Sequence, residues 1–355
     1  NKYAMTVRQP CGVAGLIIAA NTPIANVGWK VFPALICGNS VVLKAAEDTP
    51  VTAWIFSKIA HEVGLPPGVL NTIQGLGLEA GAPLVEHLGV DILSFTGSTS
   101  VGRWIAEVAG KQLTKVSLEL GGKNPFVVCD DADLDNAVQW TCLSAFSNAG
   151  QRCASGSRVI VFDKVYDEFK ERLIEATKKL KVGSSNDDDL GPVINERQLN
   201  NMVTSIQRAK EEGVTVHCGG YRMEGARHAK GFYMAPTILD DVNKDAEISK
   251  CELFGPIAAL YRVSNFNEAL NLANDSPYGL TACIHTRSYH RAMHFTYKVK
   301  CGATVVNAGT YGSEPHMPFG GVRQSGNGSR EPGTEALDVY SELKDIYMIV
   351  DPDKV

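Results

Sequence analysis

The run Val13-Ala14-Gly15-Leu16-Ile17-Ile18-Ala19-Ala20 is apolar over its whole length. Such a run is typical of a strand that helices cover on both faces, as in a parallel sheet. Outward from it, strand-like and helix-like runs alternate over about four units. The expected strands are 40–44, 69–73, 92–96 and 115–118, and the expected helices are 23–37, 49–63, 80–87 and 100–109. This order predicts a doubly wound parallel sheet with right-handed crossovers.

Two local signals refine this half of the chain. Pro33 is expected to bend or interrupt the helix 23–37. Thr49 before Pro50 is expected to be the N-cap of the next helix. Segment 2–8 and the final segment 343–350 are expected to be strands at the two ends of the chain. From Gly121 onward the alternation continues with longer helices, at 133–145, 166–181, 195–212, 266–274 and 288–298.

The composition is that of a globular protein with more than one core. A length of 355 residues favours two domains, and 44% hydrophobic with 21% charged residues is ordinary for this class. A net charge of -5 argues against a general nucleic-acid binder. Nine cysteines without a CxxC pair indicate a reducing compartment, for which we expect the cytoplasm. The apolar runs are too short to span a membrane.

A cysteine lies in a glycine-flanked turn, Gly150-Gln151-Arg152-Cys153-Ala154-Ser155-Gly156, between helix 133–145 and a strand at 159–162. Catalytic groups favour loops held by rigid elements. Cys153 is therefore a candidate nucleophile. The alternative is a small buried side chain without a chemical role, which is the more common use of a cysteine.

Three polar residues at the ends of predicted strands or in loops are candidates for the catalytic site. Glu119 ends a buried strand, so burial can raise its pKa and make it a general base. Asn21, after the first buried strand, can donate a side-chain N–H to an oxyanion. Glu252, in Glu252-Leu253-Phe254-Gly255-Pro256, is a further acidic candidate. Each of the three can instead be a hydrogen-bonded turn residue.

Two segments suggest a dinucleotide site. Lys44 and Glu47 lie at the carboxyl end of a predicted parallel strand, the edge at which such sheets bind ligands. Thr96-Gly97-Ser98 closes a strand and opens a helix, whose N-terminus favours phosphate. The second segment matches neither GxGxxG nor a Walker A loop. The alternatives are a solvent-facing salt pair and a simple tight turn.

Metal ligands are not expected. His290 and His294 are four residues apart but have no third ligand, and an exposed helix face explains them. The acidic loop 184–189 is expected to face solvent.

Together these segments resemble the NAD(P)-dependent aldehyde dehydrogenase superfamily over residues 9–350. The motifs that carry the resemblance are residues 20–23, 44–47, 95–99, 119–123, 150–153, 252–256 and 318–321. The resemblance implies an α/β protein with an NAD-binding domain at 10–121 and a catalytic α/β domain at 122–325. It also implies oligomerisation strands in 1–9 and 326–355, a homodimer or homotetramer, and a chain that lacks roughly the first third of the family's length.

The resemblance also implies a role for each site residue. Cys153 would be the nucleophile, Glu119 the general base, and Asn21 the oxyanion donor together with the backbone N–H of Cys153. The cofactor would contact Ile17, Ile18, Asn21, Lys44, Glu47, Gly77, Thr96, Gly97, Ser98, Val101, Leu120, Glu252 and Phe254. NAD is expected rather than NADP, because the Glu47 carboxylate would repel a 2'-phosphate.

The implied reaction oxidises an aldehyde to a carboxylic acid through a cysteine thiohemiacetal and a thioester. Similar enzymes that pass the acyl group to coenzyme A lack the glutamate, so Glu119 favours a free acid. One alternative is a truncated, catalytically idle relative that binds dinucleotide or assembles with other subunits. This alternative is suggested by the short length of the chain relative to the family, and not by the site residues.

The sequence also departs from the family's pattern. Ala20, Thr22 and Ala45 replace residues usual in the family, which changes the floor of the substrate site. The positions expected to line the aldehyde tunnel are Asn26, Trp29, Ser147, Ser313 and His316. This set is polar, so we expect the substrate to be a small polar or charged aldehyde. We expect neither nucleic acid nor membrane as a partner.

Overall fold

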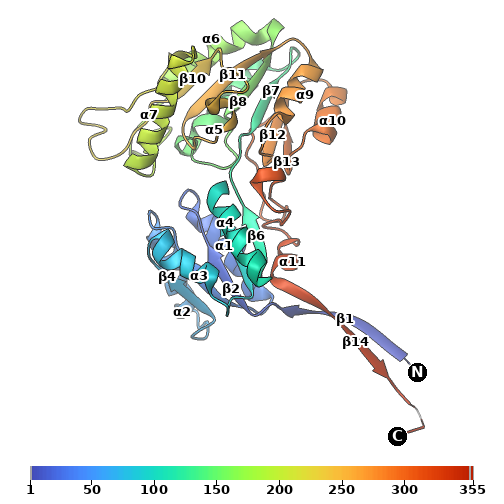
Figure 1. Ribbon diagram of the computed structural model, residues 1–355. Coiled ribbons are helices and arrows are strands. Elements are labelled where there is room, and N and C mark those ends of the chain that lie inside the picture. Colours follow the sequence, from blue (N-terminus) through green and yellow to red (C-terminus); the bar gives the residue numbers. More distant parts are fainter. Residues whose placement is uncertain (1, 352, 355) are drawn as a thin grey trace. The chain divides into compact units, whose positions relative to one another are not determined.

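The structure is a computed structural model that describes residues 2–351, 353 and 354. The chain forms two compact units (Figure 1). The first contains residues 1–119, 314–319 and 328–355, and the second contains residues 120–313 and 320–327.

The first unit is built on a five-stranded parallel sheet. Its strands are β2 (Val13–Ile17), β3 (Ser40–Lys44), β4 (Leu70–Ile73), β5 (Ile92–Thr96) and β6 (Lys115–Glu119). They lie in the order β4-β3-β2-β5-β6, so the apolar run forms the central strand, as predicted. Ile17 lies opposite both Lys44 and Phe95. The direction of winding reverses between β2 and β5, and such a reversal leaves a crevice at the carboxyl ends of the strands.

Helices complete this unit. They are α1 (Pro23–Ile36), α2 (Pro50–Glu62), the π-turn η1 (Gly77–Gly81), α3 (Ala82–Glu86), α4 (Thr99–Gln112) and α11 (Ala336–Tyr340). One core joins α1, α2 and α11 to the sheet through residues such as Leu16, Val31 and Tyr340.

The predicted interruption of helix α1 at Pro33 is wrong, whereas Thr49 is the N-cap residue of α2, as predicted. Helix α1 continues through Pro33, whose carbonyl accepts a hydrogen bond from the Cys37 N–H at 3.1 Å. A proline removes its own N–H but leaves its carbonyl to the next turn. Thr49 occupies the N-cap position of α2, but its buried hydroxyl has no hydrogen-bond partner among the described residues. Both predicted positions are confirmed, Thr49 at the N-cap and Pro50 at the first helical position, but the Thr49 side chain makes no capping hydrogen bond within the described part of the chain.

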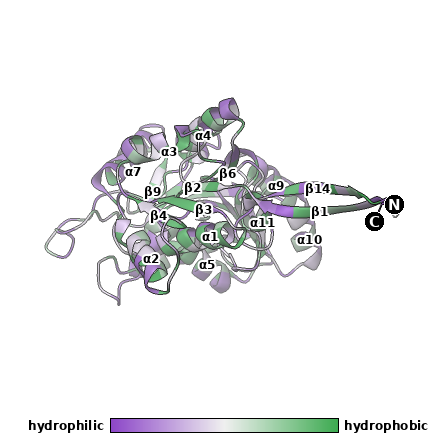
Figure 2. Cartoon of the chain, turned by 90° about the horizontal axis from the view of Figure 1, so that it is seen from below, coloured by the Kyte–Doolittle hydropathy of each residue, from purple (hydrophilic) through white to green (hydrophobic). Residues whose placement is uncertain are grey.

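Helices α1 and α2 carry exposed apolar side chains. Figure 2 shows hydrophobic residues along both helices in green. Ile24, Phe32 and Ile36 recur at multiples of four residues on α1, and Val51, Ile55 and Ile59 recur in the same way on α2. Phe32 packs edge-on against Phe56, with ring centroids 5.4 Å apart, so the two helices are in contact. This face is apolar and accessible in the described chain.

The two ends of the chain form a separate antiparallel ribbon within the first unit. β1 (Lys2–Pro10) pairs with β14 (Ser341–Ile349) along its whole length, from Lys2 opposite Ile349 to Pro10 opposite Ser341. Both terminal strands were predicted, and the structure shows that they pair with each other. Figure 1 shows the ribbon extending away from the five-stranded sheet.

The second unit is a three-layer α/β structure. Its strands are β7 (Pro125–Val128), β8 (Arg158–Phe162), β9 (Thr215–Cys218), β10 (Thr237–Asp240), β11 (Ile257–Val263), β12 (Thr281–His285) and β13 (Ala303–Val306). They lie in the order β13-β12-β7-β8-β11-β10-β9, and β9 alone among these described strands runs antiparallel to its neighbour. The predicted α/β fold class is confirmed.

Helices cover both faces of this sheet. α5 (Leu134–Phe146) and α6 (Asp163–Lys179) pack on one face. α7 (Glu196–Glu211), α9 (Phe266–Asn274) and α10 (Tyr289–Lys298) pack on the other. The short elements α8 (Glu247–Lys250), η2 (Ser147–Gly150) and η3 (Arg323–Ser325) lie in the connections. Within the described residues, the helices are all too short or too polar to cross a membrane.

Candidate active site

In the first unit, the predicted cofactor residues follow the carboxyl ends of neighbouring strands. Ile17 ends β2, and Ile18 and Asn21 follow it. Lys44 ends β3, Thr96 ends β5, and Glu119 ends β6 opposite Thr96. Because parallel strands end at one edge of a sheet, the fold gathers these positions there. That edge includes the reversal of strand order between β2 and β5.

Lys44 and Glu47 form an ion pair of 2.9 Å between Nζ and Oε2. The Lys44 side chain is 3% exposed, whereas that of Glu47 is 45% exposed. The two residues do form a salt pair, but the alternative of a solvent-facing pair does not hold, because the Lys44 side chain is buried. A buried ammonium beside a half-exposed carboxylate suits hydrogen bonding to vicinal hydroxyls of a ribose.

The segment after β5 forms the N-terminus of α4, as predicted. Ser98 is the N-cap of α4, and its hydroxyl accepts from the Val101 N–H at 3.4 Å. A Cβ on Gly97 would lie 2.4 Å from the Phe95 ring, so only glycine fits there. Gly77, in contrast, opens η1 in open space, where an added Cβ would meet no atom within 4 Å. The N-terminal turn of a helix is where backbone N–H groups and the helix dipole favour an anion.

Glu119 is 5% exposed, and both its carboxylate oxygens are buried without a hydrogen-bond partner among the described residues. Burial raises its pKa well above the usual value, and the charge of Glu331 raises it further. The charges of Lys30 and Arg330 oppose this shift. A carboxyl group that is kept unpaired in a buried place is equipped to take a proton.

The polar cluster beside Glu119 was not predicted from the sequence. Glu331 forms a buried ion pair with Lys30, Nζ to Oε2 2.7 Å, and each side chain is 1% exposed. Ser94 and Ser117 donate to its other oxygen at 2.6 and 3.1 Å. A signal was present in α1, where Lys30 takes a core position between buried Val27 and Ala34.

In the second unit, Cys153 lies half-buried in the turn between η2 and β8, as predicted. Asn148, Ala149 and Gly150 before it are left-handed, with φ of 54°, 53° and 66°. This conformation costs about 1 kcal/mol or more for each residue other than glycine. The surrounding unit therefore imposes the shape of the turn, which is common where function requires a fixed geometry.

The turn of Cys153 contacts the loop of Glu252. A Cβ on Gly150 would lie 2.0 Å from the Gly255 carbonyl oxygen. Gly122 donates its N–H to Glu252 Oε1 at 3.0 Å, and a Cβ on Gly121 would lie 2.1 Å from Glu252 Oε2. The backbone of Gly255 leaves no room for a side chain on Gly150, whereas a side chain on Gly121 would have to displace the Glu252 carboxylate. The structure brings these two predicted loops together within one unit.

Burial raises the pKa of Glu252 to about 7, although the Gly122 N–H and the charge of Lys123 lower it. Phe254 is left-handed, with φ of 54°, so the loop that carries Glu252 is also held in an unusual shape. Leu120 is buried, and its N–H donates to the Ser325 carbonyl at 3.0 Å.

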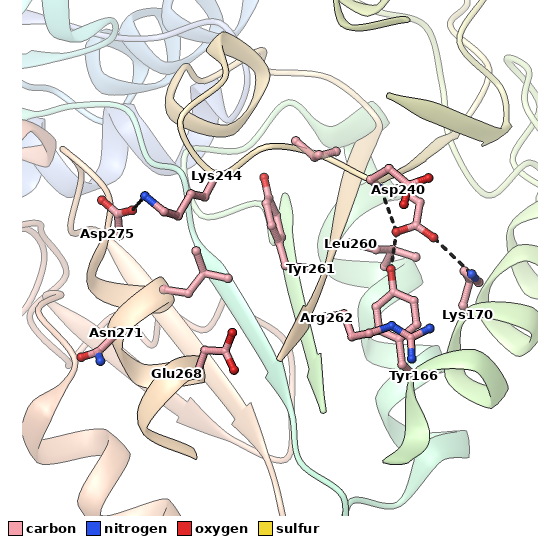
Figure 3. A pocket seen from close by; sticks show the side chains of 13 residues that line it. Tyr166, Lys170, Asp240, Lys244, Leu260, Tyr261, Arg262, Glu268, Asn271 and Asp275 are labelled. Atoms are coloured by element: carbon pink, nitrogen blue, oxygen red, sulfur yellow. Dashed lines mark hydrogen bonds and ion pairs between the residues drawn. The ribbon is translucent and has the colours of Figure 1, made fainter. Parts of the chain in front are cut away.

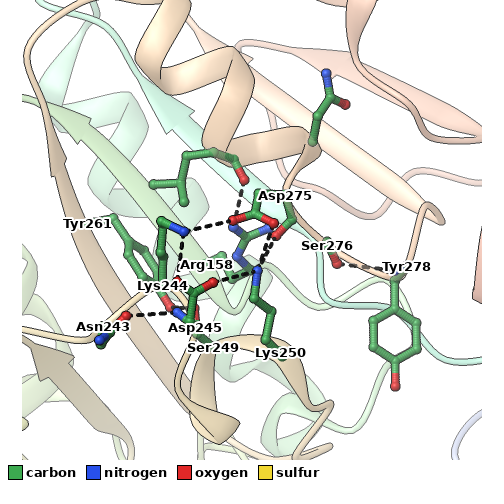
Figure 4. Close-up of polar contacts among 12 residues, drawn as sticks. Arg158, Asn243, Lys244, Asp245, Ser249, Lys250, Tyr261, Asp275, Ser276 and Tyr278 are labelled. Atoms are coloured by element: carbon green, nitrogen blue, oxygen red, sulfur yellow. Dashed lines mark hydrogen bonds and ion pairs between the residues drawn. The ribbon is translucent and has the colours of Figure 1, made fainter.

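Two buried cations near Glu252 were not predicted. Burial, together with the charge of Arg158, lowers the pKa of Lys123 to about 8. Arg158 is fully buried and donates from Nη2 to the Leu272 carbonyl at 2.6 Å. Figure 4 shows Arg158 beside the ion pair of Lys250 and Asp275, 2.8 Å between Nζ and Oδ1. An arginine at the first position of a strand gives no local signal that it will be buried.

A surface pocket of about 770 Å³ in this unit has none of the predicted site residues in its lining (Figure 3). Its charged groups pair with each other or with neighbours, as Lys170 does with Asp240 at 3.2 Å and Arg262 with Asp167 at 2.6 Å. Its size alone therefore does not make it the site of chemistry.

Other predictions concerned metal ligands and the acidic loop. Across the residues that the structure describes, no three His, Cys, Asp or Glu side chains are grouped so as to hold a metal ion. The loop 184–189 does more than face solvent. Asp188 accepts from the Ser185 N–H at 2.9 Å and pairs with Arg227, and Asp189 accepts from the Lys181 N–H at 2.7 Å.

Comparison with known proteins decides the family. The model of the aldehyde dehydrogenase family matches residues 1–346. The chain belongs to the aldehyde dehydrogenase family. Across 345 residues it is 41% identical to the alpha-ketoglutaric semialdehyde dehydrogenase of Bacillus subtilis, a match that covers 97% of this chain and 71% of that protein. It is 42% identical to the mitochondrial benzaldehyde dehydrogenase of Antirrhinum majus, over 96% of this chain and 64% of that protein.

Solved structures agree with this family assignment. The betaine aldehyde dehydrogenase of Staphylococcus aureus, in complex with NAD+, superposes with a TM-score of 0.95 at 35% identity. The match covers 98% of this chain and 68% of that one. The predictions of an NAD(P)-dependent aldehyde dehydrogenase and of a nicotinamide cofactor are thereby confirmed for the family. The chain spans about two thirds of the length of such relatives.

Proposed function

We propose that the chain catalyses the NAD-dependent oxidation of an aldehyde to a carboxylic acid through a thioester on Cys153. Membership of the aldehyde dehydrogenase family supports aldehyde oxidation. The observation that carries the finer proposal is the Glu119 carboxyl group, which is buried, unpaired and raised in pKa. Such a group suits a hydrolytic step, because a carboxylate with a raised pKa is a stronger base toward water.

The first step is the attack of the Cys153 sulfur on the aldehyde carbon. The thiolate is the reactive form, so the thiol proton passes to a base as the carbon–sulfur bond forms. The aldehyde oxygen becomes an oxyanion. We assign its stabilisation to the side-chain N–H of Asn21 and the backbone N–H of Cys153.

When bound, NAD+ accepts the hydride that leaves the thiohemiacetal carbon. The residues of this chain hold the cofactor. Lys44 and Glu47 would bind the adenosine ribose, the α4 N-terminus at Ser98 the pyrophosphate, and Glu252 the nicotinamide ribose. The geometry fits these roles, because the Lys44–Glu47 pair and Ser98 follow neighbouring strands of the first unit's sheet. The Glu47 carboxylate would repel a 2'-phosphate, which supports NAD over NADP.

Glu119 then removes a proton from a water molecule that attacks the thioester. The carbon–sulfur bond breaks, the carboxylic acid leaves, and Cys153 recovers its proton. A glutamate in this role favours a free acid over transfer of the acyl group to coenzyme A. The alternative of a catalytically idle relative is not favoured, because the chain retains Cys153, Glu119 and Asn21 together with its family membership.

The substrate that we propose is a small polar or charged aldehyde. The residues behind this proposal are the polar set Asn26, Ser147, Ser313 and His316 with Trp29. In the first unit, Asn26 is buried and donates to the Thr22 carbonyl at 2.9 Å, so part of its amide is engaged in α1. The names of relatives include semialdehyde, benzaldehyde and retinaldehyde dehydrogenases, so they do not decide the class.

Assembly and compartment complete the proposal. The β1–β14 ribbon has two long exposed strands, and we propose that it joins copies into a homodimer or homotetramer. All nine cysteines lie in the described residues and none is in a disulfide, which supports a reducing compartment such as the cytoplasm.

The test is NADH formation, followed by absorbance, with a panel of short polar, charged and apolar aldehydes. The expected result is turnover that Cys153→Ala abolishes, with polar aldehydes giving the larger kcat/KM. Well-folded protein that binds NAD without forming NADH would contradict the proposed activity. Equal turnover in Cys153→Ala would contradict the cysteine mechanism.

A further inference from the structure

Asn124 occupies a buried position between three segments of the second unit. It directly precedes β7 and is 1% exposed. Its side-chain amide donates to the carbonyl of Cys153 at 2.8 Å and to that of Ser155 at 2.9 Å. Its oxygen accepts from the N–H of Thr281, the first residue of β12, at 3.0 Å. Only this orientation of the amide places both donors on carbonyls and the oxygen on an N–H.

Thr310 binds the carbonyl of Ala154, which lies between the carbonyls of Cys153 and Ser155 in the chain. Its hydroxyl donates to the Ala154 carbonyl at 2.6 Å, and the residue is fully buried. Three successive carbonyls, those of residues 153, 154 and 155, are therefore each bound by a buried side chain. A turn has no regular ladder to satisfy its carbonyls, so these side chains determine how its peptide planes are oriented.

The orientation of the Cys153 peptide plane bears directly on the thiol. The direction of the Cys153 carbonyl is determined by the ψ angle of Cys153. Together with φ, this ψ angle determines where the Cα–Cβ bond, and therefore the thiol, points. Close packing restrains the same carbonyl, because a Cβ on Gly122 would lie 2.3 Å from the Cys153 oxygen. The left-handed residues before Cys153 fix the turn from its other side.

From this geometry we infer that Asn124 and Thr310 are positioning residues for the Cys153 nucleophile. They set its direction through the carbonyls of the turn and do not contact the substrate or the cofactor. The inference rests on the proposed role of Cys153 as the nucleophile. A misplacement of about 1 Å at a reacting group can cost roughly a hundredfold in rate. Loss of the hydrogen bonds from Asn124 or Thr310 is therefore expected to lower the rate measurably.

The test compares Asn124→Ser and Thr310→Val with the parent. Serine is too short to reach both carbonyls, and valine keeps the shape of threonine without its hydroxyl. Thr141→Val is the matched control, because its buried hydroxyl donates to the Ala137 carbonyl inside α5 rather than to a carbonyl of the turn. The first readout is the rate and pH profile of Cys153 alkylation by iodoacetamide, followed on the Cys153 peptide by mass spectrometry. The second is kcat and KM for NAD and aldehyde.

For Asn124→Ser and Thr310→Val we expect kcat to fall about tenfold or more, with KM for NAD within about twofold. The pH profile of Cys153 alkylation should shift in both variants and stay unchanged in Thr141→Val. Folded variants that alkylate Cys153 with the parent's rate and profile would overturn the inference. Alkylation requires no turnover, so absence of NADH formation in every protein, the parent included, would contradict the proposed function and leave the positioning test intact. Should Asn124→Ser fail to fold, Thr310→Val decides alone.

Discussion

Lys30 and Glu331 form an ion pair that is almost wholly removed from solvent, although 301 residues separate them in sequence. The pair ties α1 to the segment before α11 within the first unit. Ser94 and Ser117 complete the hydrogen bonding of the Glu331 carboxylate. Because the charge of Glu331 raises the pKa of Glu119, the pair connects the stability of this unit to the chemistry of the proposed base.

Removing one partner of this pair should be costly. Glu331→Gln leaves the Lys30 ammonium buried without a counter-charge, and we expect a loss of about 3–5 kcal/mol in the free energy of unfolding. Lys30→Met combined with Glu331→Gln should cost less than the sum of the single changes, since neither charge then remains alone. Urea denaturation of the three variants measures this. Strict additivity would show that the pair contributes no coupling.

Glu119→Gln should stabilise the protein as pH rises. The pKa of Glu119 is raised in the folded state, so its stability contribution is fully present below the ordinary glutamate pKa of about 4.3 and is lost above it. Glutamine mimics the protonated acid and avoids this loss. Above pH about 4.3, the free energy of unfolding of the variant should therefore rise relative to that of the parent, by at most about 1.4 kcal/mol for each unit of pKa shift.

An exposed glutamate provides the control for that measurement. Lys111 lowers the pKa of Glu107 in α4, so Glu107→Gln should change stability with the opposite sign over the acid range. Denaturation curves for the parent and both variants between pH 3 and 8 make the comparison, because the Glu107 contribution changes below the ordinary glutamate pKa of about 4.3 and the Glu119 contribution changes above it. A flat difference between Glu119→Gln and the parent would contradict the raised pKa.

The affinity for NAD should fall in acid because of Glu252. Its pKa is raised to about 7, so lowering the pH through 7 protonates it and removes the charged acceptor proposed for the nicotinamide ribose. Glu252→Gln should bind NAD with weaker but nearly pH-independent affinity. Calorimetric titration with NAD from pH 6 to 8 measures both proteins. An unchanged pH dependence in Glu252→Gln would remove Glu252 from the cofactor site.

Two glycine substitutions should have opposite outcomes. A methyl group on Gly121 would lie 2.1 Å from the Glu252 carboxylate, so Gly121→Ala should displace it and weaken NAD binding by about tenfold. Gly110 lies in α4 with nothing within 4 Å of the added carbon. Gly110→Ala should leave binding unchanged and stabilise the protein by about 0.5–1 kcal/mol. Thermal melts with NAD titrations test the pair, and equal effects would contradict the crowding at Gly121.

The terminal ribbon should control assembly. Met5 lies opposite Ile346, and the exposed apolar residues Tyr3 and Met348 form the next pair on the same face. Met5→Lys with Ile346→Lys should therefore reduce the oligomer to smaller species. Light scattering after size-exclusion chromatography measures the mass. The control is Thr6→Lys, on the other face, where Asp345 offers a charge partner. An unchanged mass in the double variant would contradict assembly through this face.

The local patterns predicted much of the fold. The apolar run at 13–20 indicated the central strand, and the alternation around it indicated the parallel sheet. The strand itself ends at Ile17, because the chain then leaves the sheet for the loop that carries Asn21. Strands β7 and β9 to β12 of the second unit were not predicted from the sequence. Strands β7, β9 and β10 are only four residues long, which gives little periodicity to detect.

The candidate site was likewise predicted only in part from the sequence. Cys153, Glu119 and Glu252 stand in short motifs, so sequence could propose them. Asn124 binds residues 29, 31 and 157 positions away, and such contacts leave no periodic pattern. The buried charges of Lys30 and Arg158 were missed for the same reason, since only the tertiary fold supplies their surroundings.

The central claim is that Cys153 carries the acyl group and that Glu119 is needed to release it. The most direct measurement mixes Glu119→Gln with NAD+ and a short aldehyde, then follows the Cys153 peptide by mass spectrometry. We expect about one equivalent of NADH per chain and an acyl adduct on Cys153 that hydrolyses slowly. Sustained turnover by this variant with no adduct on Cys153 would contradict the claim.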